Sequence, residues 1–175
     1  DVYKRQPQAL KDADVALKKD PSRAEGYLTR GRIHLRKGET HNALQDFNKT
    51  IDLKPLLSEG YAFRGDTHIR LKNHNKAQSD FEKAIALGTL RPDVYLGLGD
   101  IYLERQEYEK SLEKYDIAVQ IAPQSFVSYL KRGAYFFRFK QYKEALSNYD
   151  KALDLGAEKT ADIFVNRGII HTELG

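Results

Sequence analysis

The sequence predicts an all-α protein, an α-solenoid of stacked antiparallel helix pairs. The first observation is a glycine that recurs at intervals of 34, 34, 34 and 35 residues, at Gly31, Gly65, Gly99, Gly133 and Gly168. The second is that apolar residues on both sides of these glycines follow helical spacing rather than strand alternation. A fixed period of this length is typical of repeat architectures. Because one helix pair cannot bury its apolar face alone, neighbouring pairs are expected to stack into one core.

Further positions repeat with the glycine. An aromatic residue lies four residues before it, at Tyr27, Tyr61, Tyr95, Tyr129 and Phe164. A ring lies three residues after it, at His34, His68, Tyr102, Phe136 and His171. A small residue, then an aromatic four positions later, follow in the second half, as in Ala43 and Phe47. Glycine inside a helix costs roughly 1 kcal/mol against alanine, so its regular return indicates that two helices approach closely there.

The elements are expected in the following order. Residues 1–6, DVYKRQ, resemble a translated sequencing-adaptor fragment, and we expect a non-native or disordered leader. The remaining segments are the second helix of an incomplete repeat (7–23), four complete repeats (24–57, 58–91, 92–125 and 126–160) and the first helix of an incomplete repeat (161–175). Neither end reads as a polar capping helix, so we expect an internal fragment of a longer array, with fraying or self-association through its uncapped ends.

The pattern resembles the tetratricopeptide repeat, a 34-residue helix–turn–helix unit with the consensus W-x2-L-G-x2-Y, A-x3-F and P. The resemblance covers residues 7–175 and implies a right-handed superhelix. Tyrosine or phenylalanine replaces the tryptophan, and arginine replaces the leucine before the glycine at Arg30, Arg64, Arg132 and Arg167. Two repeats end in Leu87-Gly88 and Leu155-Gly156, with Thr89 and Ala157 where proline is expected, which predicts locally different linkers.

The arginine before the glycine has a partner pattern. Asp46 lies sixteen residues after Arg30, and Asp80 lies sixteen residues after Arg64. In the third repeat both partners are lost together, as Leu98 and Lys114, and in the fourth Arg132 is matched by Asn148. This co-variation favours a link between the two helices of one repeat over the alternative, an arginine ladder for phosphate or carboxylate ligands.

No chemistry-bearing motif is present. The sequence has no cysteine, no phosphate-binding loop, no G-x-S-x-G elbow and no H-E-x-x-H motif. His34, His68 and His171 share their slot with Tyr102 and Phe136, which indicates packing rather than metal binding. We therefore expect no catalytic residues, no metal and no cofactor, and we expect that the chain is not an enzyme.

Composition limits the partners. The chain is 41% hydrophobic and 31% charged, and its net charge of +4 is not gathered into a long basic run, so no nucleic acid is expected. No apolar run is long enough for a bilayer span, so no membrane partner is expected. The absence of cysteine fits a reducing compartment, and we expect a cytoplasmic protein.

The resemblance implies function as a scaffold or adaptor that binds a peptide segment of a partner protein in a concave groove lined by the first helices. The family's groove positions, with one flanking position, correspond here to Leu28, Arg32, Leu35, Arg36, Ala62, Asp66, Ile69, Arg70, Leu96, Asp100, Leu103, Glu104, Leu130, Ala134, Phe137 and Arg138. Some of the apolar members would instead pack on the adjacent repeat. A second hypothesis is a targeting or regulatory arm of a larger enzyme whose catalytic domain lies outside these residues.

One subclass of the family binds the acidic C-terminal tails of heat-shock chaperones through a clamp of lysine, asparagine and arginine side chains. Counted from the first repeat, the clamp positions here are Leu28, Arg32, Phe63, Asp93 and Gly97. Counted from the second repeat, they are Ala62, Asp66, Gly97, Val127 and Lys131. Neither set supplies the clamp residues, so no chaperone-tail carboxylate clamp is expected.

Overall fold

The computed structural model describes residues 2–157 and 161–175, and every regular element in these ranges is a helix. The helices are α1 (Val2–Lys19), α2 (Ala24–Arg36), α3 (Thr40–Leu53), α4 (Ser58–Arg70), α5 (His74–Ala86), α6 (Pro92–Glu104), α7 (Tyr108–Ile121), α8 (Phe126–Arg138), α9 (Tyr142–Asp154) and α10 (Ala161–Leu174). The predicted all-α fold class is confirmed. Helix α1 includes residues 2–6; their assignment as a non-native leader stays a prediction.

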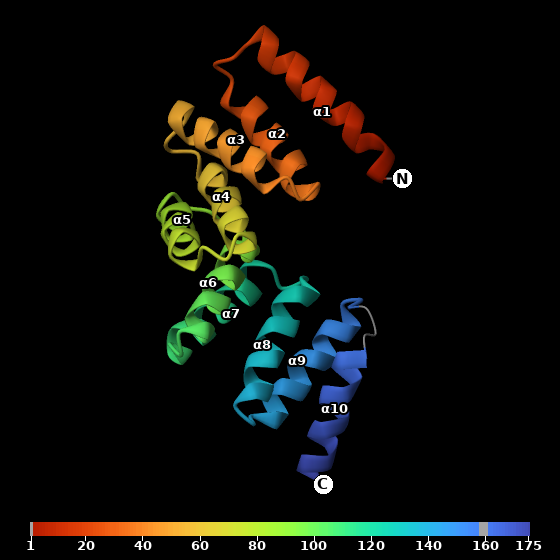
Figure 1. The fold of residues 1–175 in the computed structure, drawn as a ribbon. Coiled ribbons are helices and arrows are strands. Elements are labelled where there is room, and N and C mark those ends of the chain that lie inside the picture. The colour runs from red at the N-terminus through yellow and green to blue at the C-terminus, as the bar shows by residue number, and fades with distance from the viewer. Residues whose placement is uncertain (1, 158–160) are drawn as a thin grey trace. The chain divides into compact units, whose positions relative to one another are not determined.

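The chain divides into two compact units, Asp1–Leu90 and Arg91–Gly175, here called unit 1 and unit 2. In unit 1, α2 pairs with α3 and α4 pairs with α5 through short turns (Figure 1). Helix α3 then packs on α4, α1 packs on α2, and α2 also contacts α4. The first helices of successive repeats therefore meet each other as well as their own second helices.

Unit 2 repeats this arrangement with its own helices. Helix α6 pairs with α7, and α8 pairs with α9 (Figure 1). Helix α7 packs on α8, α10 packs on α9, and α6 also contacts α8. The buried core around α9 includes Tyr149, Ile163 and Ile170. None of the described helices combines the length and the apolar character needed to cross a membrane.

The recurring glycines mark close helix contacts. A Cβ atom built on Gly31 would lie 2.7 Å from the ring of Phe47, and one on Gly99 would lie 2.5 Å from the ring of Tyr115. Such distances are too short for any side chain, so glycine is required where the ring of the second helix presses on the first. Gly168 of α10 differs, because a Cβ atom there would meet nothing within 4 Å.

The turn inside each repeat uses a left-handed residue at a fixed position. This residue is Gly38 in the first repeat (φ 78°), then Lys72 (φ 58°), Gln106 (φ 63°) and Lys140 (φ 58°). The following amide closes the turn, as when the Glu39 N–H donates to the carbonyl oxygen of His34 at 2.9 Å. Only the first of these turns has the residue that the left-handed conformation favours.

The linkers between repeats differ as the sequence predicts. Gly88 and Gly156 adopt left-handed conformations (φ 81° and 87°), and the next amide, of Thr89 or Ala157, bonds back to its helix at 3.1 Å or 2.9 Å. The proline-containing linkers instead leave their helices through residues with negative φ, Lys54 (φ −138°) and Ala122 (φ −130°). The chain therefore uses two alternative ways of ending a second helix.

Candidate peptide-binding surface

The predicted groove residues all lie on the first helices of the repeats, α2 and α4 in unit 1 and α6 and α8 in unit 2. Their side chains fall into three groups. Leu35, Ala62 and Leu96 are buried. The half-buried members are Leu28, Asp66, Ile69, Asp100, Leu103, Leu130 and Phe137, and the exposed members are Arg32, Arg36, Arg70, Glu104, Ala134 and Arg138. The buried members belong to the packing of the repeats, so only the other two groups can meet a ligand.

In unit 1, two groove arginines are positioned by the neighbouring helix. The guanidinium carbon of Arg32 on α2 lies 5.0 Å from the centre of the Phe63 ring on α4. Arg70 on α4 donates from Nη1 to the carbonyl oxygen of Leu35 at the end of α2, at 3.0 Å. Cation–π and helix-terminus contacts of this kind hold a charged head in place without neutralising its charge. Arg36 is exposed, and no carboxylate in the described part of the chain pairs with it.

In unit 2, the acidic groove residue Asp100 is bound by the chain itself. The Tyr115 hydroxyl donates to its Oδ1 atom at 2.7 Å, and Lys131 Nζ lies 2.7 Å from its Oδ2 atom. Burial, reinforced by Asp100, raises the pKa of Tyr115 above its ordinary value. This contact has no repeat signal, because the other complete repeats have no lysine at the position of Lys131. Asp100 therefore offers an incoming peptide less negative charge than its position suggests.

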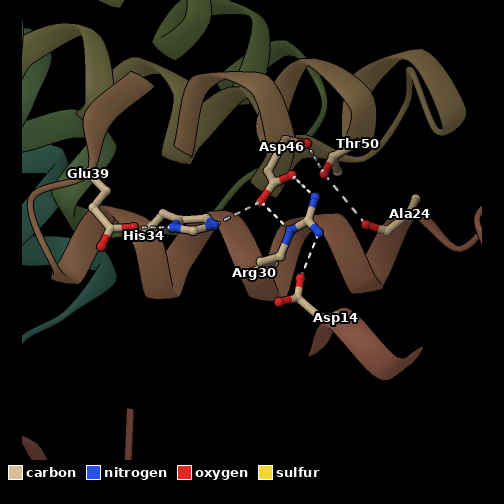
Figure 2. A network of polar contacts seen from close by, with 7 residues as sticks. All are labelled: Asp14, Ala24, Arg30, His34, Glu39, Asp46 and Thr50. Carbon is tan, nitrogen blue, oxygen red and sulfur yellow. Dashed lines mark hydrogen bonds and ion pairs between the residues drawn. The ribbon is translucent and has the colours of Figure 1, made fainter. Parts of the chain in front are cut away.

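The predicted link between the helices of one repeat is confirmed (Figure 2). Arg30 donates from Nε and Nη2 to the two carboxylate oxygens of Asp46, at 2.9 Å and 2.7 Å. Arg64 binds Asp80 in the same way, at 2.8 Å and 2.7 Å. These hydrogen bonds to Asp46 and Asp80 raise the pKa of each arginine above its ordinary value. The alternative of a ligand-binding ladder is disfavoured, because the same donors are already occupied.

A second link was missed. The Nη1 atom of each arginine donates to the second helix of the preceding repeat, to Asp14 from Arg30, to Asn48 from Arg64 and to Asp116 from Arg132, each at 2.8 Å (Figure 2 shows the first). The sequence spacing could have predicted this link, because each acceptor lies sixteen residues before its arginine. The arginine ring contact was missed as well: the Arg30 guanidinium carbon lies 5.6 Å from the centre of the Tyr27 ring.

The histidine three residues after the repeat glycine lies beside this network. His34 Nδ1 lies 2.5 Å from Glu39 Oε2, and its Nε2 lies 3.8 Å from Asp46 Oδ2 (Figure 2). Hydrogen bonds from Lys37 and His34 lower the pKa of Glu39 to about 2. His68 is buried, which lowers its pKa below the ordinary value, and its Nδ1 atom has no partner among the described residues. Across residues 2–157 and 161–175, no three acidic or histidine side chains gather to hold a metal ion.

Open clefts lie away from the predicted groove. One of about 390 Å³ lies over Arg64, between α3, α4 and α5, with Asn48 and Asp80 in its lining. Another of about 660 Å³ lies around Arg132 and α9. Both are open grooves between helices that expose the arginine links of the repeats, and the first is also lined by His68.

Comparison with known proteins gives the family. The model of the tetratricopeptide repeat matches residues 6–57 and 64–126, and the chain therefore belongs to the tetratricopeptide repeat family. Proteins of this family are generally protein–protein interaction scaffolds. The search of curated proteins gives no match.

Solved structures share the fold. The crystal structure of MamA is 25% identical with a TM-score of 0.73, over 90% of this chain and 92% of that one. YrrB, a repeat protein of the family with an unusual peptide-binding site, is 20% identical with a TM-score of 0.76, over 95% and 85% of the two chains. A thermophilic repeat protein of the family from Thermus thermophilus is 20% identical with a TM-score of 0.76, over 98% and 93%.

Proposed function

We propose that this chain is a non-catalytic scaffold that binds an extended peptide segment of another protein on the first helices of its repeats. In unit 1 the surface formed by Arg32, Arg36 and Arg70 would receive carboxylates of that peptide. YrrB, which shares the fold, has a peptide-binding site, so peptide binding has a precedent in this fold.

The observation that carries the proposal is the way in which the unit 1 arginines are held. Arg32 lies over Phe63, and Arg70 uses one donor on the carbonyl oxygen of Leu35. A guanidinium has five N–H donors, so most donors of Arg70 remain available for a ligand. Both guanidinium groups are already held in position. Binding a carboxylate would therefore cost these arginines less side-chain conformational entropy than it would cost mobile side chains.

The half-buried apolar residues of unit 2 would supply a different contribution. Leu103, Leu130 and Phe137 are neither fully packed nor fully exposed. Side chains of this kind provide the apolar anchors that dominate peptide affinity, whereas charges mainly set orientation and association rate. With Asp100 bound to Lys131, unit 2 would select its ligand mainly through these apolar residues, whereas unit 1 would select its ligand through its arginines. The unit 1 surface thus prefers a peptide with acidic residues, and the unit 2 surface prefers one with a large apolar side chain.

A peptide-array screen followed by titration of the best peptide tests this proposal. Replacing Arg32 and Arg36 together by Glu should weaken binding by about tenfold or more and slow association most at low salt. Phe137→Ala should weaken binding more than Asp100→Ala. Lys49→Glu on α3 is the matched control, since Lys49 is exposed on a second helix. Binding that survives the groove changes and is lost with Lys49→Glu would refute the proposed surface.

A further inference from the structure

Helix α10 presents an apolar face that no other described helix covers. Ile163 and Ile170 are buried against α9, whereas Phe164, Val165 and Ile169 are 44%, 58% and 42% exposed. In the first complete repeat the positions of Gly168 and Ile169 are Gly31, which meets Phe47 of its own second helix, and Arg32, which lies over Phe63 of the next first helix. The exposed side of α10 therefore corresponds to the surface on which a second helix and a following first helix pack in a complete repeat.

The arginine of α10 shows which chemistry would complete the pair. Arg167 makes the backward link, from Nη2 to Asp150 Oδ1 at 3.0 Å. Its Nε atom is buried and has no hydrogen-bond partner within the described residues. In Arg30 and Arg64 the same Nε atom donates to the aspartate of the following second helix, at 2.9 Å and 2.8 Å. The Nε atom of Arg167 is thus suited to a carboxylate on a helix that packs against α10.

Gly168 supports the same conclusion independently. The equivalent glycines Gly31, Gly65, Gly99 and Gly133 all face an aromatic ring, whereas Gly168 faces open space. Glycine at this position weakens an exposed helix without any packing gain. Its presence is explained if another helix approaches α10 closely at this point.

Helix α1 carries the complementary half. Ala9, Asp12, Ala13 and Ala16 lie 34 residues before Ala43, Asp46, Phe47 and Thr50, the positions by which α3 meets α2. Asp12 is exposed, and all four residues line an apolar cleft of about 390 Å³ between α1 and α2. The cleft lies where a first helix preceding α1 would pack, and Asp12 is at the register of the aspartate that binds Arg30.

We propose that α10 of one chain docks into this cleft on a second copy, so that Arg167 binds Asp12 of the other molecule and completes a repeat across the interface. The small side chains of α1 admit the exposed face of α10, and the charges of Arg167 and Asp12 are opposite. The contact is head-to-tail, so it joins copies into rings or open filaments rather than into a single two-fold dimer.

Sedimentation velocity over a wide range of protein concentration tests the contact. The unaltered chain should gain mass progressively with concentration. Arg167→Asp and Asp12→Arg should each raise the apparent dissociation constant by about a hundredfold, because like charges then meet at the interface. Lys49→Asp makes the same change of charge as Arg167→Asp on exposed α3 surface, and it should associate like the unaltered chain.

A mixture of the two variants gives the decisive measurement. Each variant alone should be monomeric, whereas an equimolar mixture should associate again, because Arg167 of one variant can meet Asp12 of the other. Circular dichroism establishes that both variants fold. An unaltered chain that is monomeric at every concentration overturns the proposal. Folded variants that stay monomeric when mixed, or that associate like the unaltered chain when separate, overturn it equally.

Discussion

At the scale of single residues, the arginine before the repeat glycine links neighbouring helices in three of the four complete repeats. Its side chain is shared by three helices: its own, the second helix of its repeat and the second helix of the repeat before. The within-repeat half was predictable because both partners change together in the third repeat. The other half was not inferred, because an acceptor that alternates between aspartate and asparagine gives a weaker co-variation signal.

We expect Arg64→Ala to lower the free energy of unfolding by about 3 kcal/mol, because it leaves the carboxylate of Asp80 buried without its partner. Asp80→Ala should also destabilise. The double variant should cost less than the sum of the two, with a coupling energy of about 1–3 kcal/mol. Urea unfolding of the four proteins gives this energy.

The pair Lys54–Glu25 is the control for this cycle, since its side chains are 53% and 51% exposed. Its coupling energy should be clearly smaller than that of the buried pair, because solvent screens the two exposed charges. If the effects of the Arg64 and Asp80 substitutions on the free energy of unfolding were additive, the coupling energy would be zero. The contact between the two side chains would then not stabilise the fold.

At the scale of elements, apolar periodicity was sufficient to predict the helices, whereas the turns were only partly predictable. Gly38 signals a left-handed residue, but Lys72, Gln106 and Lys140 adopt the same conformation without a local sequence signal. Their conformation is imposed by the need to join two packed helices through the same short connection. The repeat register, rather than local preference, is what identifies these positions.

Lys140→Gly should therefore stabilise the chain by about 1 kcal/mol, because it removes the steric cost of a side chain at positive φ. Gly38→Lys should destabilise it by a similar amount. Thermal or urea unfolding measures both changes. Lys151→Gly, inside α9, is the control and should destabilise by about 1 kcal/mol. A loss of stability in Lys140→Gly as large as in Lys151→Gly would contradict this account of the turn.

At the scale of the whole molecule, the 34-residue period was enough to predict the all-α repeat fold, whereas the groove residues stay a prediction. Family positions identify the helix face, but Leu35, Ala62 and Leu96 are buried within it. Whether an apolar residue on that face meets a ligand depends on the bulk of its neighbours in the adjacent repeat. The exposure of such a residue depends on packing between repeats, so the sequence of a single repeat does not reveal it.

Local stability should vary along the chain in step with helix contacts. Helix α10 packs on α9 and exposes Phe164 and Val165, whereas α9 packs on both α8 and α10. In dilute solution the amides of α10 should exchange with solvent faster than those of α9, because few buried contacts oppose its local opening. Hydrogen exchange followed by mass spectrometry measures this difference. Equal protection of α9 and α10 in the monomer would contradict it.

The shared arginine also bears on how such a chain can lengthen. Arg64 reaches acceptors sixteen residues away in both directions, Asn48 and Asp80. A tandem duplication of residues 24–57 would place the copied Arg30 after Asn48 and before its own copied Asp46, so both links would form in the new repeat at once. Duplication of one period in the gene thus also copies the arginine contacts that join the new repeat to its neighbours. The array can therefore grow without any compensating substitution.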